Sequence, residues 1–224
     1  MFFINNKFFF YILISFFTLE VIAQTPFYCD GTRLLDLKLG HILQNYQNCN
    51  EILQSSKGGL VCNGNFLFDL KTNKRLQTYP NCPGILQESK SGFICVNNQL
   101  LDLKTNKLLQ SYSDCKQVLA SSNSGLACNG SYLVDLRLNM SIQYFNDCPD
   151  LLKNSKGGLA CIKGYLKDLR TNKPLKITDD CKVVLAKSKG GLICSGNSLV
   201  DLKTNKVLHI FDDCNQRLES SIRF

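Results

Sequence analysis

Short apolar runs recur along the whole chain, each bounded by Gly, Asn, Ser or Lys. Runs of about four to seven residues are too short for typical helices and predict strands. In the last complete repeat the pattern predicts four strands, at 182–187, 191–195, 198–203 and 207–211. The connections Ser-Lys-Gly, Gly-Asn and Thr-Asn are residue types that accept positive φ in tight hairpins. The pattern therefore predicts a four-stranded antiparallel meander.

The first of these four strands has an alternative interpretation. The sequence Asn/Asp-Cys-x-Glu/Gln, as in Asn48 to Glu51 or Asp114 to Gln117, resembles a helix capping box, with Gly as the C-cap. With these caps, the segment would be a two-turn helix and not a strand. The β-branched residues at 118, 183 and 184 favour a strand. We therefore expect the strand and keep the helix as the alternative.

The pattern repeats with a fixed period over nearly the whole chain. Cysteines occur in two registers, and within each register successive cysteines lie 33 residues apart without any insertion. The first register is Cys29, Cys62, Cys95, Cys128, Cys161 and Cys194, and the second is Cys49, Cys82, Cys115, Cys148, Cys181 and Cys214. A constant period in this range indicates one supersecondary unit repeated many times.

An Asp stands at the end of the third predicted strand in every repeat, always followed by Leu: Asp36, Asp69, Asp102, Asp135, Asp168 and Asp201. A ring of carboxylates could bind calcium. The structural interpretation is stronger, because an Asp before a Leu-Lys-Thr-Asn turn can accept hydrogen bonds from the backbone and hydroxyl of the turn.

The last repeat resembles a blade of the WD-repeat family. SKGGLICSG followed by LVDLKTNKVL matches the family's Ser-x-x-Gly before the second strand and its Asp before a Thr-Gly-Lys turn, at Ser188, Gly191, Asp201, Thr204 and Lys206. The resemblance covers about residues 25–221. The chain departs from the family in having no Trp, no Gly-His pair and Asn205 in place of the turn Gly. The resemblance implies a β-propeller.

The two ends of the repeat array complement each other. The array opens with the second strand of a blade and ends with 214–221, a first strand without a blade of its own. In an open stack both orphan edges would be exposed, which is an aggregation liability. We therefore expect an all-β fold, a six-bladed β-propeller closed by the C-terminal strand, since propellers have about four to eight blades. A β-rich solenoid of the same repeats is the alternative.

The N-terminus indicates secretion. Lys7 precedes the apolar run FFFYILISFF, and Val21-Ile22-Ala23 provides small residues for cleavage. The run is shorter than the ~20 residues of a membrane span. We expect a signal peptide at residues 1–23, a mature domain at 24–224 and no membrane span after cleavage.

N-glycosylation sequons at Asn129 and Asn139 fit an extracellular compartment. The 12 cysteines then indicate a disulfide framework.

Two regular disulfide schemes are possible. Each pair either closes within a repeat, as Cys29–Cys49, or bridges to the next, as Cys49–Cys62. In a meander the second cysteine enters the next blade, whose strands are ~4.8 Å apart. Proximity therefore favours the bridging scheme, with Cys214 paired to Cys29. Strict hairpin register places Cys194 opposite Leu185 instead of Cys181, which weighs against it.

The sequence contains no catalytic motif. The chain has two His residues, His41 and His209, no Gly-rich phosphate loop and no Cys/His cluster with zinc spacing. We expect neither a metal nor another cofactor. Uniform repeats also leave no unit-specific residues for an asymmetric active site, so we expect no enzymatic activity.

The net charge of +8 is concentrated at one end of the predicted meanders. The Gly-containing turns there carry Lys57, Lys90, Lys156, Lys187 and Lys189. The candidate ligand-binding residues are in the other turns: Lys71, Lys74, Lys104, Lys107, Lys173, Lys203 and Lys206. A clustered positive field attracts polyanions. We expect a binding module for extracellular acidic glycans or cell-surface protein partners, and not for nucleic acid. A self-associating coat or matrix protein is the alternative. Lys as a merely solubilising turn residue explains the pattern equally well.

Overall fold

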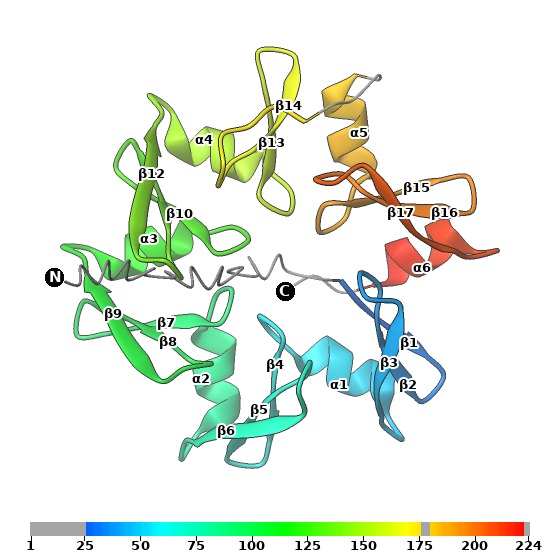
Figure 1. Cartoon of the computed structure of the whole chain (residues 1–224). Coiled ribbons are helices and arrows are strands. Elements are labelled where there is room, and N and C mark those ends of the chain that lie inside the picture. Colours follow the sequence, from blue (N-terminus) through cyan, green and yellow to red (C-terminus); the bar gives the residue numbers. More distant parts are fainter. Residues whose placement is uncertain (1–25, 176–179, 222–224) are drawn as a thin grey trace, which may run out of the picture.

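The computed structural model describes residues 26–175 and 180–221, which form six similar units arranged around a ring (Figure 1). We number the units 1 to 6 in chain order. The first strands are β1 (Phe27–Asp30), β4 (Leu60–Asn63), β7 (Phe93–Val96), β10 (Leu126–Asn129), β13 (Leu159–Ile162) and β15 (Leu192–Ser195). The second strands are β2 (Arg33–Asp36), β5 (Phe66–Asp69), β8 (Gln99–Asp102), β11 (Tyr132–Asp135), β14 (Tyr165–Asp168) and β16 (Ser198–Asp201).

The third strands and the helices complete the units. The third strands are β3 (His41–Asn45), β6 (Lys74–Thr78), β9 (Lys107–Ser111), β12 (Met140–Tyr144) and β17 (Lys206–Ile210). The helices are α1 (Cys49–Ser55), α2 (Cys82–Glu88), α3 (Cys115–Ala120), α4 (Cys148–Lys153), α5 (Cys181–Lys187) and α6 (Cys214–Ser220). Each sheet is antiparallel, with the second strand in the middle. The described part of unit 5 has two strands, and Pro174, which cannot donate an N–H, forms an isolated bridge with Lys167.

The segment after each second-register cysteine is a helix, so the predicted first strand is wrong and the helix alternative is confirmed. Its expected caps are only partly present, because Asn48 makes no side-chain cap bond and the C-caps are Ser or Asn and not Gly. The Asn81 side chain accepts a hydrogen bond from Gly84 N at 3.1 Å, and Asp114 accepts one from Gln117 N at 2.9 Å. Cys49 and Leu53 are both buried, and residues four apart lie on one face of a helix. The caps and this spacing outweigh the strand preference of the β-branched residues.

The closed six-bladed propeller is therefore wrong, and so is the resemblance to WD repeats. The protein consists of small disulfide-bonded modules, each with a sheet of two or three described strands and one helix, and none of the sheets closes. The C-terminal segment does not supply a strand to unit 1, because it is the helix α6. The Ser of the supposed blade motif has a different role here: Ser188 Oγ donates to Leu185 O at 2.9 Å at the end of α5. The β-solenoid is wrong as well, since a helix is part of every unit.

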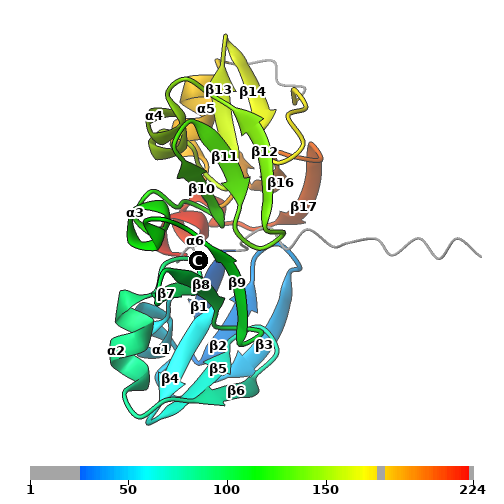
Figure 2. The ribbon, with the colours of Figure 1, turned by 90° about the vertical axis from the view of Figure 1, so that its left-hand side faces the viewer.

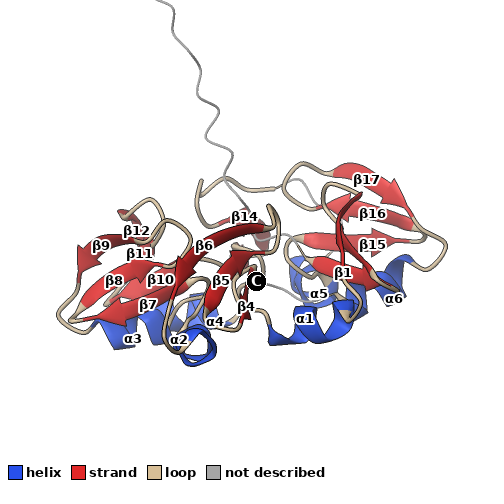
Figure 3. Ribbon diagram, turned by 90° about the horizontal axis from the view of Figure 1, so that it is seen from below, coloured by secondary structure: helices blue, strands red, loops and turns tan. Residues whose placement is uncertain are grey.

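The ring has two different faces. The six helices lie on one face, which we call the helix face, and the third strands lie on the opposite one, the strand face (Figures 2 and 3). In Figure 1 the loops that join the first and second strands point away from the centre of the ring, for example at β13–β14. The turns from second to third strands begin at the opposite ends of the same short strands. These turns therefore lie at the inner side of the ring.

Neighbouring units share their cores through one leucine. Leu70, directly after β5 in unit 2, packs into the core cluster of unit 1 with Phe27, Leu34 and Leu53. Leu103 of unit 3 enters the core of unit 2 in the same way. Leu37 of unit 1 lies in the core of unit 6. The last unit therefore packs against the first with the contact used elsewhere in the ring.

All six disulfides close within their own units, so the favoured bridging scheme is wrong. The pairs are Cys29–Cys49, Cys62–Cys82, Cys95–Cys115, Cys128–Cys148, Cys161–Cys181 and Cys194–Cys214. The second cysteine does not enter a strand of the next unit, as the bridging scheme requires. That cysteine instead begins a helix that packs back on the first strand of its own unit, with Cα atoms 5.8 Å apart for Cys29 and Cys49.

Candidate functional site

The turn between the second and third strands is organised by the buried Asp at its start. Asp69 Oδ1 accepts hydrogen bonds from Lys71 N at 2.9 Å and Thr72 N at 3.0 Å. The same backbone bonds occur at Asp36, Asp135, Asp168 and Asp201. Asp102 accepts the first of these bonds, from Lys104 N at 2.8 Å. Acceptance of backbone hydrogen bonds from the turn is the structural role expected for these Asp residues. No group of three His, Cys, Asp or Glu side chains that could hold a metal occurs in the described ranges.

The second carboxylate oxygen of these Asp residues faces the next unit. Asp69 Oδ2 lies 2.8 Å from Lys104 Nζ, and both side chains are largely buried. Three further pairs have the same separation of 35 residues: Asp36–Lys71, Asp135–Arg170 and Asp168–Lys203. Asp201 of unit 6 pairs with Lys38 of unit 1, the corresponding cation of the unit that follows it in the ring. At the junction of units 3 and 4, Arg137 instead lies over the ring of Phe93, 5.9 Å from its centroid. The Lys or Arg two residues after the buried Asp of one unit thus contacts the preceding unit of the ring.

These ion pairs perturb the titration of two carboxyls. Burial raises the pKa of Asp69, but the charge and hydrogen bond of Lys104 and the backbone bonds from Thr72 and Lys71 outweigh it. The net pKa of Asp69 is therefore lowered. Asp168 has a lowered pKa for the same reasons, with Lys203 as the cation. Both carboxylates are ionised at neutral pH and neutralise the first lysine of the next turn.

The structure thus divides the seven predicted ligand-binding lysines into two groups. Lys71, Lys104 and Lys203 are half-buried and form the ion pairs with Asp. Lys74, Lys107, Lys173 and Lys206 are exposed, and we call these four the basic rim. None of the six turns contains an acidic residue after its buried Asp. The exposed charge on these inner turns is therefore of one sign.

The lysines of the Gly-containing turns have a structural role that the sequence did not reveal. Lys57 Nζ donates to Gln87 O at the end of α2, at 2.5 Å. Lys90, Lys156 and Lys189 reach the last carbonyls of α3, α5 and α6 in the same way. Asn123 replaces the lysine opposite α4. A cation at a helix C-terminus interacts favourably with the helix dipole. Burial lowers the pKa of Lys90.

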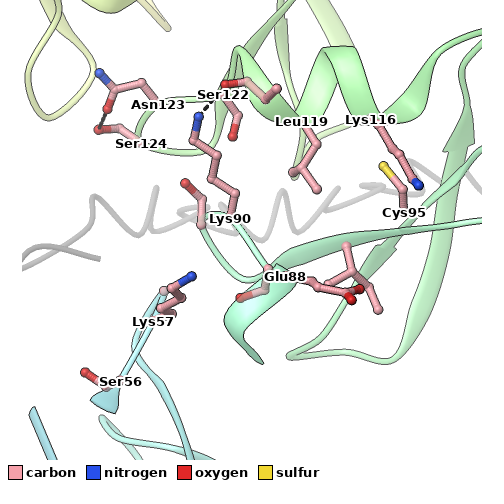
Figure 4. A pocket seen from close by; sticks show the side chains of 15 residues that line it. Ser56, Lys57, Glu88, Lys90, Cys95, Lys116, Leu119, Ser122, Asn123 and Ser124 are labelled. Atoms are coloured by element: carbon pink, nitrogen blue, oxygen red, sulfur yellow. Dashed lines mark hydrogen bonds between the residues drawn. The ribbon is translucent and has the colours of Figure 1, made fainter. Parts of the chain in front are cut away.

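A cavity of about 750 Å³ lies between these turns and α3, lined by Lys57, Lys90, Lys116 and Ser122 among others (Figure 4). Ser122 Oγ is buried without a hydrogen-bond partner, whereas its counterpart Ser89 donates to Leu86 O. Ser121, directly before Ser122, donates to Val118 O at 2.8 Å. Smaller cavities of about 700 and 580 Å³ recur beside α5 and α6. Neither His41 nor His209 lines any of the three.

The two histidines do not form a catalytic pair with any group described above. His41 is exposed at the start of β3. His209 lies in β17, with its ring 5.8 Å from Phe211, and a Cβ atom at Gly40 would be only 1.9 Å from it. His209 therefore packs against unit 1.

Both sequons lie in unit 4. Asn129 is exposed at the end of β10, and Asn139 is exposed in the turn before β12 with φ of 56°.

The predicted signal peptide and its cleavage site after Ala23 lie outside the described residues. Across residues 26–175 and 180–221, no helix is long and apolar enough to cross a bilayer.

Comparison with known proteins adds no assignment. The chain matches no protein-family model, and no curated protein is significantly similar to it.

Proposed function

We propose that this protein is an extracellular, non-enzymatic binding module that recognises acidic glycans through its basic rim. Six intrachain disulfides fit an extracellular protein, since disulfides persist in oxidising compartments. The observation that carries the proposal is that the carboxylate of each turn is buried, whereas the last lysine of four turns is exposed. Each buried Asp is held by its own turn, whereas Lys74, Lys107, Lys173 and Lys206 are exposed.

This arrangement favours a ligand with many negative charges over a small anion. The four exposed ammonium groups belong to four different units, an arrangement that suits an extended ligand. A polymer with repeated sulfate or carboxylate groups can lie along the inner turns and contact several units. Such binding depends on long-range attraction and weakens with salt, because the Debye length is about 8 Å at physiological ionic strength.

The test compares two variants with the same change of charge. The first variant replaces the basic rim lysines Lys74, Lys107, Lys173 and Lys206 with Ser. The second replaces four exposed lysines of α3, α4 and α5, on the helix face, with Ser: Lys116, Lys153, Lys182 and Lys187. Neither change touches an Asp–Lys pair. On immobilised heparin, the rim variant should elute at a clearly lower salt concentration than the helix-face variant. Equal retention of the two variants would reject the rim as the binding site.

A self-associating structural protein is the second candidate. The observation in its favour is that the third strands are unpaired at their outer edges and expose Ile42, Leu108, Val207 and Ile210. Against it, these strands are short, three of them begin with Lys, and their pairing with the second strands is irregular. Such features protect sheet edges from association. A monomer in dilute solution would favour the binding module, and a polymer the structural protein.

A further inference from the structure

Unit 4 carries a pair of exposed tyrosines. Tyr132 begins β11 and Tyr144 ends β12, and the two residues are partners in the register. Their ring centroids are 5.4 Å apart with an edge-to-face angle of 75°. Each residue is about half exposed, at 53% and 54%. Large exposed aromatic surface on a soluble protein marks a place where something else packs.

The side chain that neighbours this pair is the sequon asparagine Asn129. Asn129 is the register partner of Tyr132 on the other side of β11. Residues directly opposite each other in antiparallel strands point to the same face of the sheet, with Cβ atoms about 4.5–5.5 Å apart. Asn129, Tyr132 and Tyr144 thus form one row across the three strands. All three are exposed.

The other units whose three strands are described lack this combination, and in unit 5 Ile162 stands at the position of Asn129. The corresponding rows are Asp30–Arg33–Asn45 in unit 1, Val96–Gln99–Ser111 in unit 3 and Ser195–Ser198–Ile210 in unit 6. The row of unit 2 is the nearest match, with Asn63, Phe66 and Thr78. There Arg75 already covers the ring of Phe66, 4.3 Å from its centroid. Asn63-Gly64-Asn65 is also not a sequon.

We propose that Tyr132 and Tyr144 form a platform on which the first sugars of an N-linked glycan at Asn129 are stacked. This inference rests on the extracellular location in the proposed function, and not on the basic rim. The glycan donor is a lipid-pyrophosphate-linked oligosaccharide of the secretory pathway. Asn129 Nδ2 bonds to the anomeric carbon as the bond from that carbon to the pyrophosphate oxygen breaks, and the amide loses one proton. The positively polarised C–H groups of the sugar then pack on the negative faces of the rings.

The second sequon lacks such a platform. Asn139 lies between Leu138 and Met140 in the turn of unit 4, and Met140 pairs with Asp135 in the register. A glycan there has no aromatic partner in the register. The two sequons therefore differ in kind: a glycan on Asn129 is ordered by the protein, and one on Asn139 extends into solvent.

The experiment uses protein secreted from eukaryotic cells and carrying Ser141→Ala, which removes the Asn139 sequon. Intact mass should show a glycan on Asn129. Enzymatic removal of this glycan should lower Tm by about 2–4 °C, the size of shift that a modest contact produces in a chain of this length. In the Tyr132→Ser/Tyr144→Ser variant the same treatment should change Tm far less. Ring-current shifts of the first sugar's proton resonances should also disappear in that variant.

A matched control moves the glycan to unit 2. Asn65→Thr creates a sequon at Asn63, in the same place of the unit, beside a ring that Arg75 already covers. A glycan at Asn63 should raise Tm less than one at Asn129. An unoccupied Asn129, or a glycan whose effect on Tm and whose shifts survive loss of both tyrosines, would overturn the proposal. Heparin retention of the same proteins reports separately on the basic rim.

Discussion

The junction between units 2 and 3 and the junction between units 6 and 1 are built alike, although only the first is bridged by the chain. At the first, Leu103 enters the core of unit 2 and Lys104 pairs with Asp69 at 2.8 Å. At the second, Leu37 enters the core of unit 6 and Lys38 pairs with Asp201 at 3.2 Å. The contacts between units therefore follow from the surface of each unit and do not need the covalent connection.

The junction of units 6 and 1 nevertheless differs locally from the others. Between units 1 and 2, Tyr46 Oη donates to Asn73 Oδ1 at 3.4 Å. At the junction of units 6 and 1, the position of Asn73 is taken by Gly40, and His209 packs against it. The weak hydrogen bond between Tyr46 and Asn73 is thus replaced by the packing of the His209 imidazole against Gly40. The following predictions test whether the two kinds of junction are equally strong.

The largest effect is expected from the shared leucine. Leu103→Ala should lower the free energy of unfolding by about 2–5 kcal/mol, because it leaves a cavity in a fully buried site. Leu37→Ala should cost a similar amount if the junction of units 6 and 1 is formed in solution. Chemical denaturation measures both, with the exposed Leu39→Ala as the control. A large loss for Leu103→Ala beside none for Leu37→Ala would mean that the ring is open in solution.

The next effect concerns the buried ion pair and its pH dependence. Asp69→Asn should cost about 3 kcal/mol at pH 7, because it leaves Lys104 without its partner in a largely buried site. The folded pKa of Asp69 is lowered, so its contribution is complete above the unfolded pKa of about 3.9 and is lost as the pH falls through the folded pKa.

The difference in stability between the parent protein and Asp69→Asn should therefore shrink as the pH falls from 5 towards 2. Asp168→Asn should behave in the same way, since its pKa is also lowered. Asp201→Asn measures the cost of breaking the equivalent pair at the junction of units 6 and 1. A difference that stays constant down to pH 2 would show that the carboxylate charge does not contribute.

The smallest effect is expected at Gly40. Gly40→Asn introduces the residue found in the other units, but its Cβ would clash with His209, at a cost of about 1–2 kcal/mol. The backbone itself accepts Asn, because Asn73 and Asn106 also have positive φ. Adding His209→Gln, the residue at this position in units 1 to 4, should restore most of the loss. If thermal unfolding shows that the two changes simply add, His209 does not contact Gly40 in solution.

Much of the architecture could be predicted from the sequence, and the errors have specific causes. The period, the positions of the three strands and the hydrogen bonds of the buried Asp follow from local patterns. The expected strand at 182–187 is a helix, because the helical spacing of the buried Cys181, Val184 and Leu185 outweighs the strand preference of Val183 and Val184. That single error produced the wrong fold and the wrong disulfide scheme.

The sequence did not reveal how the side chains of the candidate site are paired. The sequence identified a row of lysines but not that Lys71, Lys104 and Lys203 are already paired. Their partners lie on a neighbouring unit, and a one-dimensional pattern does not contain the rotation between units. The row of Asn129, Tyr132 and Tyr144 was invisible for a similar reason, because it runs across strands.

The disulfides within the units bear on how such a protein can change its length. Each crosslink joins two cysteines 20 residues apart in the same repeat, so a duplication or deletion of one whole repeat leaves no cysteine without its partner. The leucine and the lysine that join the units are also present in each copy or in a close substitute. Genetic recombination can therefore vary the number of units while every unit remains able to oxidise correctly by itself.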